Sequence, residues 1–354
     1  MNTINISLLA MIFLSSGLFM GWSLGANDAA NIFGTAVGTK MIKFSTAAAI
    51  CSVFVIIGAV VSGAGASGTL GALGAVNTMA AAFSVSLAAA ITVMGMTGSG
   101  LPVSTSQAVV GAIIGWNLYV KIPTDISVLK KIVITWVATP ILAAVFSVMI
   151  YLIVKAVVDN TKIHILKLYK ITRIALLISG AFGAYSLGAN NIANVMGVFV
   201  KASPFKDLQL SNGAVFSGTQ QLFLLGGIAI SIGVITYSKK VIMTVGSSIF
   251  KLSPISACVV VFASSAVLFL FSSASLYEWL VSRNLPPFPL IPVSQSQAVV
   301  GAIIGIGIAK KSNNINYKQL GVIGIGWVLT PVISLLISIL ILFIVNSVFG
   351  QAVI

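Results

Sequence analysis

Asp28 is the residue of this chain whose position most directly implies chemistry, because it lies deep in a long apolar segment, in the run GANDAAN at residues 25–31. A carboxylate in such a segment is costly unless a partner offsets its charge, so it is by default a functional candidate. No Lys or Arg shares the segment. We therefore expect a bound cation or a proton as its counter-charge, with Asn27, Asn31 and backbone amides as the alternative partners. The other four acidic residues lie in or beside loops: Asp125, Asp159, Asp207 and Glu278.

A second copy of this motif, GANNIAN, occupies residues 188–194 and places Asn190, Asn191 and Asn194 where the first copy has Asn27, Asp28 and Asn31. Each set spans about one helical turn. A glycine precedes each set and would permit a local break or a close helix contact. Oxygen ligands on a loosened helix are what a hard cation such as Na⁺ would use. We assign the small residues on the same faces to helix packing: Gly17, Gly21 and Gly25, mirrored by Gly180, Ala184 and Gly188.

Another repeated segment is suited to an anion. Residues 102–115 read PVSTSQAVVGAIIG and residues 292–305 read PVSQSQAVVGAIIG, and each follows a Gly- or Pro-rich break. Proline fits the first turn of a helix, and the Ser and Thr that follow can cap free amides. An exposed helix N-terminus carries unpaired N–H groups and partial positive charge. Two such termini could together hold an oxyanion.

The repeated motifs occur in the same order in both halves of the chain, and a third pair, WVATP at 136–140 and WVLTP at 327–331, follows them. The sequence therefore predicts two homologous repeats, residues 1–154 and 174–354, joined by a basic linker at 155–173. Matching polar sets in two repeats indicate one binding site at the interface between them.

The composition is that of an integral membrane protein, with 58% hydrophobic and only 7% charged residues among 354. Its apolar runs are continuous rather than alternating, so they predict helices and not an outer-membrane barrel. The expected fold is an all-α polytopic membrane protein with two inverted-topology repeats and broken or re-entrant helices. The net charge of +14 would suggest nucleic acid in a soluble chain, but here it reflects basic loops between apolar segments, and we expect no nucleic-acid partner.

Basic residues also predict the orientation, because they concentrate in cytoplasmic loops. None occurs before Lys40 or after Lys318, whereas five lie in the linker. Both termini are therefore expected outside a plasma or inner membrane and the linker in the cytoplasm. Each half then crosses an odd number of times, and the halves are inverted. Five crossings per half is the simplest count; it leaves Lys121, Lys130 and Lys131 external, and re-entrant segments would change the count without changing the inversion.

GANDAAN, GANNIAN and the paired PVSxSQ segments closely resemble the inorganic phosphate transporter (PiT) family over nearly the whole chain. The resemblance implies a homodimeric secondary transporter that moves phosphate with Na⁺ or H⁺. By motif, it implies Na⁺ ligands at Asp28, Asn31, Asn191 and Asn194. It implies substrate contacts at Asn27, Asn190, Ser104, Thr105, Ser106, Gln107, Ser294, Gln295, Ser296 and Gln297.

Two departures from the family pattern bear on the substrate. The family often has aspartate in both motifs, where the second copy here has Asn191, and it often has Thr-Thr-His where this chain has Thr105-Ser106-Gln107 and Gln295-Ser296-Gln297. Losing one carboxylate leaves the number of coupled cations open and keeps sulfate as the alternative substrate. Phosphate still carries an O–H at neutral pH and needs acceptors, which Asp28 and the amide oxygens provide, so phosphate is the leading prediction.

Other classes of protein fit less well. An uncoupled anion channel would need polar residues along a continuous path, whereas these residues cluster at two motif pairs. An intramembrane hydrolase would need paired aspartates, a Ser/Lys pair or a His/Glu metal motif, and the apolar core has none of them. We therefore expect no enzyme activity and no cofactor. The two cysteines, Cys51 and Cys258, are expected to be buried and reduced, and the single histidine, His164, lies in the basic linker.

Overall fold

The computed structural model describes residues 8–353 except 75, 100–102, 162, 210, 212, 240, 242–251 and 313–315. Pro102, which we expected in the first turn of a helix, lies outside the described residues. The first repeat contains α1 (Leu8–Gly38), α2 (Phe44–Ser62), α3 (Ala64–Leu73), α4 (Met79–Gly98), α5 (Thr105–Val120) and α6 (Ile126–Asn160). The second contains α7 (Ile165–Met196), η1 (Gly197–Phe199), β1 (Leu208–Gln209), β2 (Val215–Phe216), α8 (Gly218–Thr236), α10 (Pro254–Ser272), α11 (Ala274–Ser282), α12 (Gln295–Ala309), α13 (Tyr317–Phe343) and the π-helical turn η2 (Ile344–Val348).

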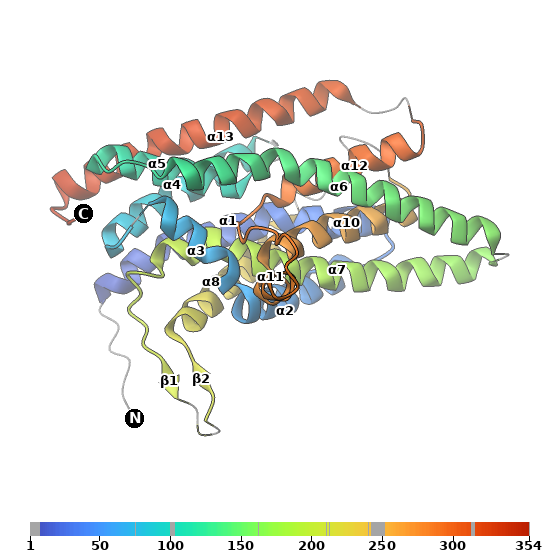
Figure 1. Ribbon diagram of the computed structural model, residues 1–354, viewed down its shortest axis with the longest axis horizontal. Helices are drawn as coiled ribbons and strands as arrows, with labels where there is room; N and C mark the ends of the chain where they lie inside the picture. The colour runs from blue at the N-terminus through green and yellow to red at the C-terminus, as the bar shows by residue number, and fades with distance from the viewer. Residues whose placement is uncertain are drawn as a thin grey trace.

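Long apolar helices dominate the fold (Figure 1). Among the described residues, seven helices are long and apolar enough to cross a membrane: α1, α2, α4, α6, α8, α10 and α13. Helices α5 and α12 have 16 and 15 residues, which is shorter than the roughly 20 residues of a full crossing. They begin at the predicted Gly- and Pro-rich breaks, so they are the interrupted helices that the sequence indicated.

Helices α1 and α7 continue through their GAND-type motifs without interruption. Of the two alternatives that these glycines permit, a local break and a close helix contact, the structure has the contact at both Gly25 and Gly188. Gly25 lies against the backbone of Ile230 in α8, and Gly188 lies against the backbone of Val55 in α2. Any cation bound at these motifs must therefore be held by side chains rather than by freed backbone carbonyls.

The two repeats are interlocked by matching contacts. Helix α2 packs along α7 as α8 packs along α1, and α6 packs along α12 as α13 packs along α5. The WVxTP motifs contribute to these contacts. Gly301 of α12 lies against the backbone of Pro140, and Gly111 of α5 lies against that of Pro331. Each WVxTP segment thus forms the surface on which the short helix of the other repeat rests.

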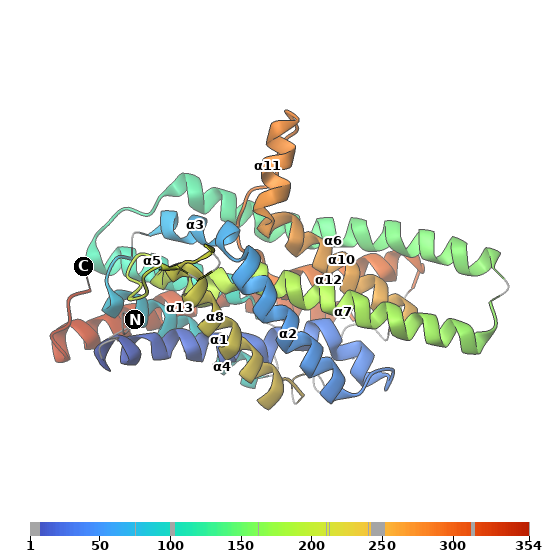
Figure 2. The same ribbon diagram turned by 90° about the horizontal axis from the view of Figure 1, so that it is seen from below.

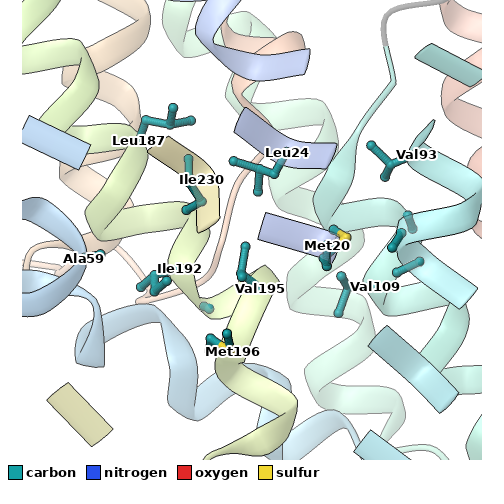
Figure 3. Close-up of a cluster of buried hydrophobic side chains, with 14 of the residues drawn as sticks. Met20, Leu24, Ala59, Val93, Val109, Leu187, Ile192, Val195, Met196 and Ile230 are labelled. Carbon is teal, nitrogen blue, oxygen red and sulfur yellow. The ribbon is translucent and has the colours of Figure 1, made fainter. Parts of the chain in front are cut away.

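The apolar core lies between the repeats, next to the polar motifs. Figure 3 shows Met20 and Leu24 of α1 on one side of Val195 of α7, with Ile192 and Met196 of α7 on its other side. These side chains belong to one large cluster of buried residues. Because both repeats contribute to this cluster, neither is expected to keep its core when separated from the other.

Two features depart from simple helical repeats. Strands β1 and β2 form a short antiparallel pair, and Asp207 just before it accepts a hydrogen bond from the Gly218 N–H at the start of α8 (2.8 Å). Helix α11 lies between α10 and α12, where the first repeat has only a short connection, and it projects away from the bundle (Figure 2).

The predicted linker is largely helical. Residues 155–160 continue α6 and residues 165–173 begin α7, so only a short turn separates the two helices. This turn lies at the end of the molecule opposite the start of α1 and the end of the chain (Figures 1 and 2).

Candidate functional site

The first turns of α5 and α12 carry the predicted anion-binding residues. Ser104 caps α5 by accepting a hydrogen bond from the Gln107 N–H (3.3 Å), and Ser294 caps α12 by accepting one from the Gln297 N–H (3.4 Å). Pro292 precedes the helix instead of occupying its first turn, because Ser294 is the cap. All eight predicted side chains of the two segments are buried. Serines therefore cap the helices as the sequence predicted, but the helices start three residues after the positions of the prolines in the sequence.

The start of α5 is contacted from three other helices, two of them in the second repeat. The Ser296 hydroxyl donates a hydrogen bond to the Val103 carbonyl (2.7 Å). The Asn194 side-chain amide donates to the Ser106 hydroxyl (3.3 Å). The Thr105 hydroxyl lies near the Asp28 carboxylate, without the geometry of a hydrogen bond. Residues from α1, α7 and α12 thus converge on one short segment.

Asp28 has few partners for a buried carboxylate. It is 1% exposed. One carboxylate oxygen accepts a hydrogen bond from the Asn27 side-chain amide (2.7 Å), and the other has no partner. Asn27 in turn accepts a hydrogen bond from the Thr97 hydroxyl at the end of α4 (3.3 Å). Thr97 was not among the predicted residues, although it is the first residue of the Gly-rich segment TGSGL at 97–101.

The second motif is arranged differently. The side-chain amide of Asn190 donates to the Val293 carbonyl (2.7 Å), and its oxygen accepts from the Val293 N–H (3.1 Å). Asn190 therefore fixes the strand-like segment that leads into α12. The oxygen of Asn191 accepts from both Asn190 (3.3 Å) and Asn194 (2.9 Å). The side-chain oxygen of Asn191 is thus part of a hydrogen-bonded network of amides, whereas Asp28, at the equivalent position of α1, has one carboxylate oxygen without a partner.

Several buried polar atoms at this junction have no hydrogen-bond partner. Buried polar groups in proteins are almost always paired, so such a cluster indicates atoms that a ligand can use. Five are acceptors and two can donate. They are Asp28 Oδ2, Gln107 Oε1, Asn194 Oδ1, Gln295 Oε1 and Gln297 Oε1, with Thr105 Oγ1 and Asn191 Nδ2. Asn31 is half-buried and lies one turn beyond Asp28 on α1.

Two further residues were missed by the sequence analysis. Ser23 and Ser186 occupy equivalent positions, are buried, and have hydroxyls without partners. These two serines could have been predicted from the sequence, because the repeated motif extends to SLGAN at residues 23–27 and 186–190. Their hydroxyls lie one turn before Asn27 and Asn190 on the same helices.

The arrangement suits the reversible binding of small ions. It combines two helix N-termini, hydroxyl and amide groups, and one carboxylate, all drawn from both repeats and shielded from solvent. Among the residues that the structure describes, no group of three or more His, Cys, Asp or Glu is placed to hold a metal ion. Oxygen atoms from amides, hydroxyls and Asp28 are therefore the ligands available to a cation here.

Comparison with known proteins agrees with this geometry. A relative from Methanocaldococcus jannaschii named "Putative phosphate permease" is 27% identical, and the alignment covers 96% of this chain and 99% of the relative. The sulfate permease of Bacillus subtilis is 30% identical, with 93% and 86% covered. A solved structure titled "The sodium-dependent phosphate transporter" has a TM-score of 0.76 and 23% identity, with 97% of this chain and 100% of that chain covered.

The family assignment follows from a match over most of the chain. Residues 24–282 and 287–353 match the model of the phosphate transporter family, so most of both repeats and all the residues predicted from the sequence to bind ions lie within the match. The seven apolar spans and the likeness to a solved transporter agree with a multi-pass membrane protein. The chain belongs to the phosphate transporter family.

Proposed function

We propose that this protein is a secondary transporter that imports inorganic phosphate together with Na⁺, by alternating access at the interface of its two repeats. The observation that carries the proposal is the cluster of unpartnered polar atoms around Asp28 and the starts of α5 and α12. The solved relative is titled a sodium-dependent phosphate transporter, which supports the choice of both ions.

Asp28 is the proposed centre of the cation site. A Na⁺ ion beside its open oxygen would offset a charge that is otherwise unpaired in a buried position. Asn31, Asn191 and Asn194 are the proposed additional ligands through their side-chain oxygens. Coupling follows from this placement, because a nearby anion is repelled by Asp28 until a cation lies between them. A proton on Asp28 is the alternative means of coupling.

The anion is proposed to lie against the starts of α5 and α12. Helix N-termini favour negative charge and offer N–H donors, and the Ser and Thr side chains add hydroxyl donors. Ser104, Thr105, Ser106 and Gln107 would contact it from the first repeat, and Ser294, Gln295, Ser296 and Gln297 from the second. Asn27 and Asn190 would support the site, Asn190 by holding Val293 in front of α12.

Unpartnered acceptors outnumber unpartnered donors in this cluster, which favours phosphate. An acceptor can bind either a cation or the O–H that phosphate retains at neutral pH, whereas sulfate has no O–H to donate. Sulfate is the second candidate, for two reasons. Asn191 replaces a second carboxylate, so the site has less negative charge to oppose a dianion, and the relative with 30% identity is named a sulfate permease.

Uptake into proteoliposomes tests the function directly. We expect an inward Na⁺ gradient to drive accumulation of labelled phosphate, with excess unlabelled phosphate blocking it and excess sulfate leaving it largely unchanged. If uptake continues when K⁺ replaces Na⁺ and an inward proton gradient is imposed, the coupling ion is H⁺. If excess sulfate but not phosphate blocks uptake, the substrate assignment is wrong while the anion site survives; conductance without accumulation would indicate a channel.

The proposed orientation places both termini outside the cell and the turn between α6 and α7 in the cytoplasm. Repeats 1–154 and 174–354 are then inverted about the linker. Two chains are proposed to form a homodimer.

Cysteine labelling tests this orientation. In a variant without Cys51 and Cys258, Asn160→Cys should react with an impermeant reagent only after the cells are opened. Ala352→Cys should react in intact cells. Both positions are exposed, so accessibility depends on the side of the membrane. Labelling of both positions from the same side would contradict the inversion.

A further inference from the structure

A polar cavity lies away from the proposed substrate site, at the end of the molecule near the α6–α7 turn. Its volume is about 200 Å³, and it is open on one side and lined by the last part of α6, the start of α10 and the end of α12. Its polar lining is formed by Tyr151, Lys155, Asp159, Ser253, Ser256 and Lys310. None of these residues belongs to the repeated motifs.

The cavity is suited to an anion. Two lysines, Lys155 and Lys310, line it together with one acidic residue, Asp159, so the lining residues carry a net positive charge. The Lys310 ammonium lies 5.6 Å from the centroid of the Tyr151 ring, which keeps it beside the cavity. Partial burial lowers the pKa of Lys310 from its ordinary value, and a bound anion would oppose that effect.

The start of α10 adds to this positive character. Ser253 caps the helix by accepting a hydrogen bond from the Ser256 N–H (3.4 Å), and the two hydroxyls lie 2.9 Å apart. The N-terminus of this 19-residue helix therefore lies at the cavity wall and contributes favourably to an anion there.

An apolar groove adjoins the polar cavity. It has a volume of about 280 Å³, lies between α6, α7 and the start of α10, and is lined mainly by aliphatic side chains such as Val157 and Ile171. Val154, Val158 and Ile255 line both spaces, so the polar cavity and the groove share a wall. Val157 and Ile171 are exposed on the outer surface of the helices, where a membrane protein meets lipid.

We propose that this paired site binds an anionic phospholipid, with its phosphodiester group between Lys155, Lys310 and the start of α10, and an acyl chain in the groove between α6 and α7. A headgroup with net negative charge complements the net positive charge of the cavity, which has two lysines and one carboxylate. Inorganic phosphate would fill only the polar cavity and would make no contact with the adjoining apolar groove. The site is separate from the substrate site and does not depend on which anion is carried.

Native mass spectrometry of the purified protein tests the proposal, using phosphatidylglycerol and phosphatidylcholine with identical acyl chains. We expect the wild type to retain phosphatidylglycerol at least fivefold better than phosphatidylcholine. Lys155→Gln with Lys310→Gln should remove this preference. The matched control, Lys43→Gln with Lys318→Gln, also removes two positive charges, but from exposed positions outside the cavity, and should keep the preference. Equal retention by the double variant and its control would overturn the proposal.

A second variant tests the acyl chain. Ala175 lines the groove but not the polar cavity, so Ala175→Phe should fill the groove and reduce retention of phosphatidylglycerol with both lysines in place. Unchanged retention in this variant would overturn the proposed acyl-chain site, and displacement of the lipid by excess inorganic phosphate would assign the cavity to free anion. Uptake by the variants in phosphatidylcholine vesicles confirms that they are folded. Because lipid retention is measured without transport, failure here is distinguishable from failure of the transport proposal.

Discussion

Asp28→Asn should abolish gradient-driven substrate accumulation while leaving the protein folded. The amide has nearly the same shape as the carboxylate and still offers an oxygen to the Asn27 side-chain amide. It removes the charge that a coupled cation would bind. A charged hydrogen bond or ligand of this kind contributes about 3 kcal/mol, which corresponds to a loss of about 100-fold in uptake. Initial rates of Na⁺-driven uptake in proteoliposomes measure the effect.

The matched control for this experiment is Glu278→Gln, which makes the same chemical change on the exposed helix α11. It should transport at the wild-type rate. Thermal unfolding of both variants should match the wild type, because Asp28→Asn removes a charge that burial disfavours. Wild-type Na⁺-dependent accumulation by Asp28→Asn would rule out Asp28 as the coupling residue.

Gly25→Ala and Gly188→Ala should each destabilise the folded protein severely. A methyl group at Gly25 would overlap the Ile230 carbonyl oxygen, and one at Gly188 would overlap the Val55 carbonyl oxygen. These neighbours are backbone atoms of α8 and α2, so a rotamer change cannot relieve the clash and the helices must separate. We expect a cost of about 3 kcal/mol or more for each variant. Thermal unfolding followed by size-exclusion chromatography measures it.

Gly34→Ala is the control within α1, because a methyl group there would meet no atom within 4 Å. It should unfold at the wild-type temperature, whereas Gly25→Ala and Gly188→Ala should unfold at much lower temperatures or fail to yield folded protein. If Gly25→Ala is as stable as Gly34→Ala, the close approach of α1 and α8 is not required for the fold.

The sequence by itself determined the membrane class, the repeated order of the motifs and the helix caps. Long apolar runs and a repeated order of motifs do not depend on how the chain folds. The caps at Ser104 and Ser294 were predictable because each is a local contact with a backbone N–H three residues later. The packing role of Gly25 and Gly188 was predictable from the spacing of small residues. The sequence could not choose between a local break and close packing at these positions, because a glycine permits either, and only its neighbours decide between them.

The tertiary structure decided which polar atoms are available for a ligand. Asn27 and Asn190 are equivalent in sequence, but Asn190 is bound at both ends to the Val293 backbone, whereas Asn27 bonds to Asp28 and Thr97. The meeting of Ser106 with Asn194 likewise joins residues 88 positions apart. Such contacts depend on how α1, α5, α7 and α12 pack, and packing is set by close approaches at glycines and prolines in the opposite repeat. A motif therefore predicts which groups can bind an ion, but hydrogen bonds formed across the repeats decide which of them remain free to do so.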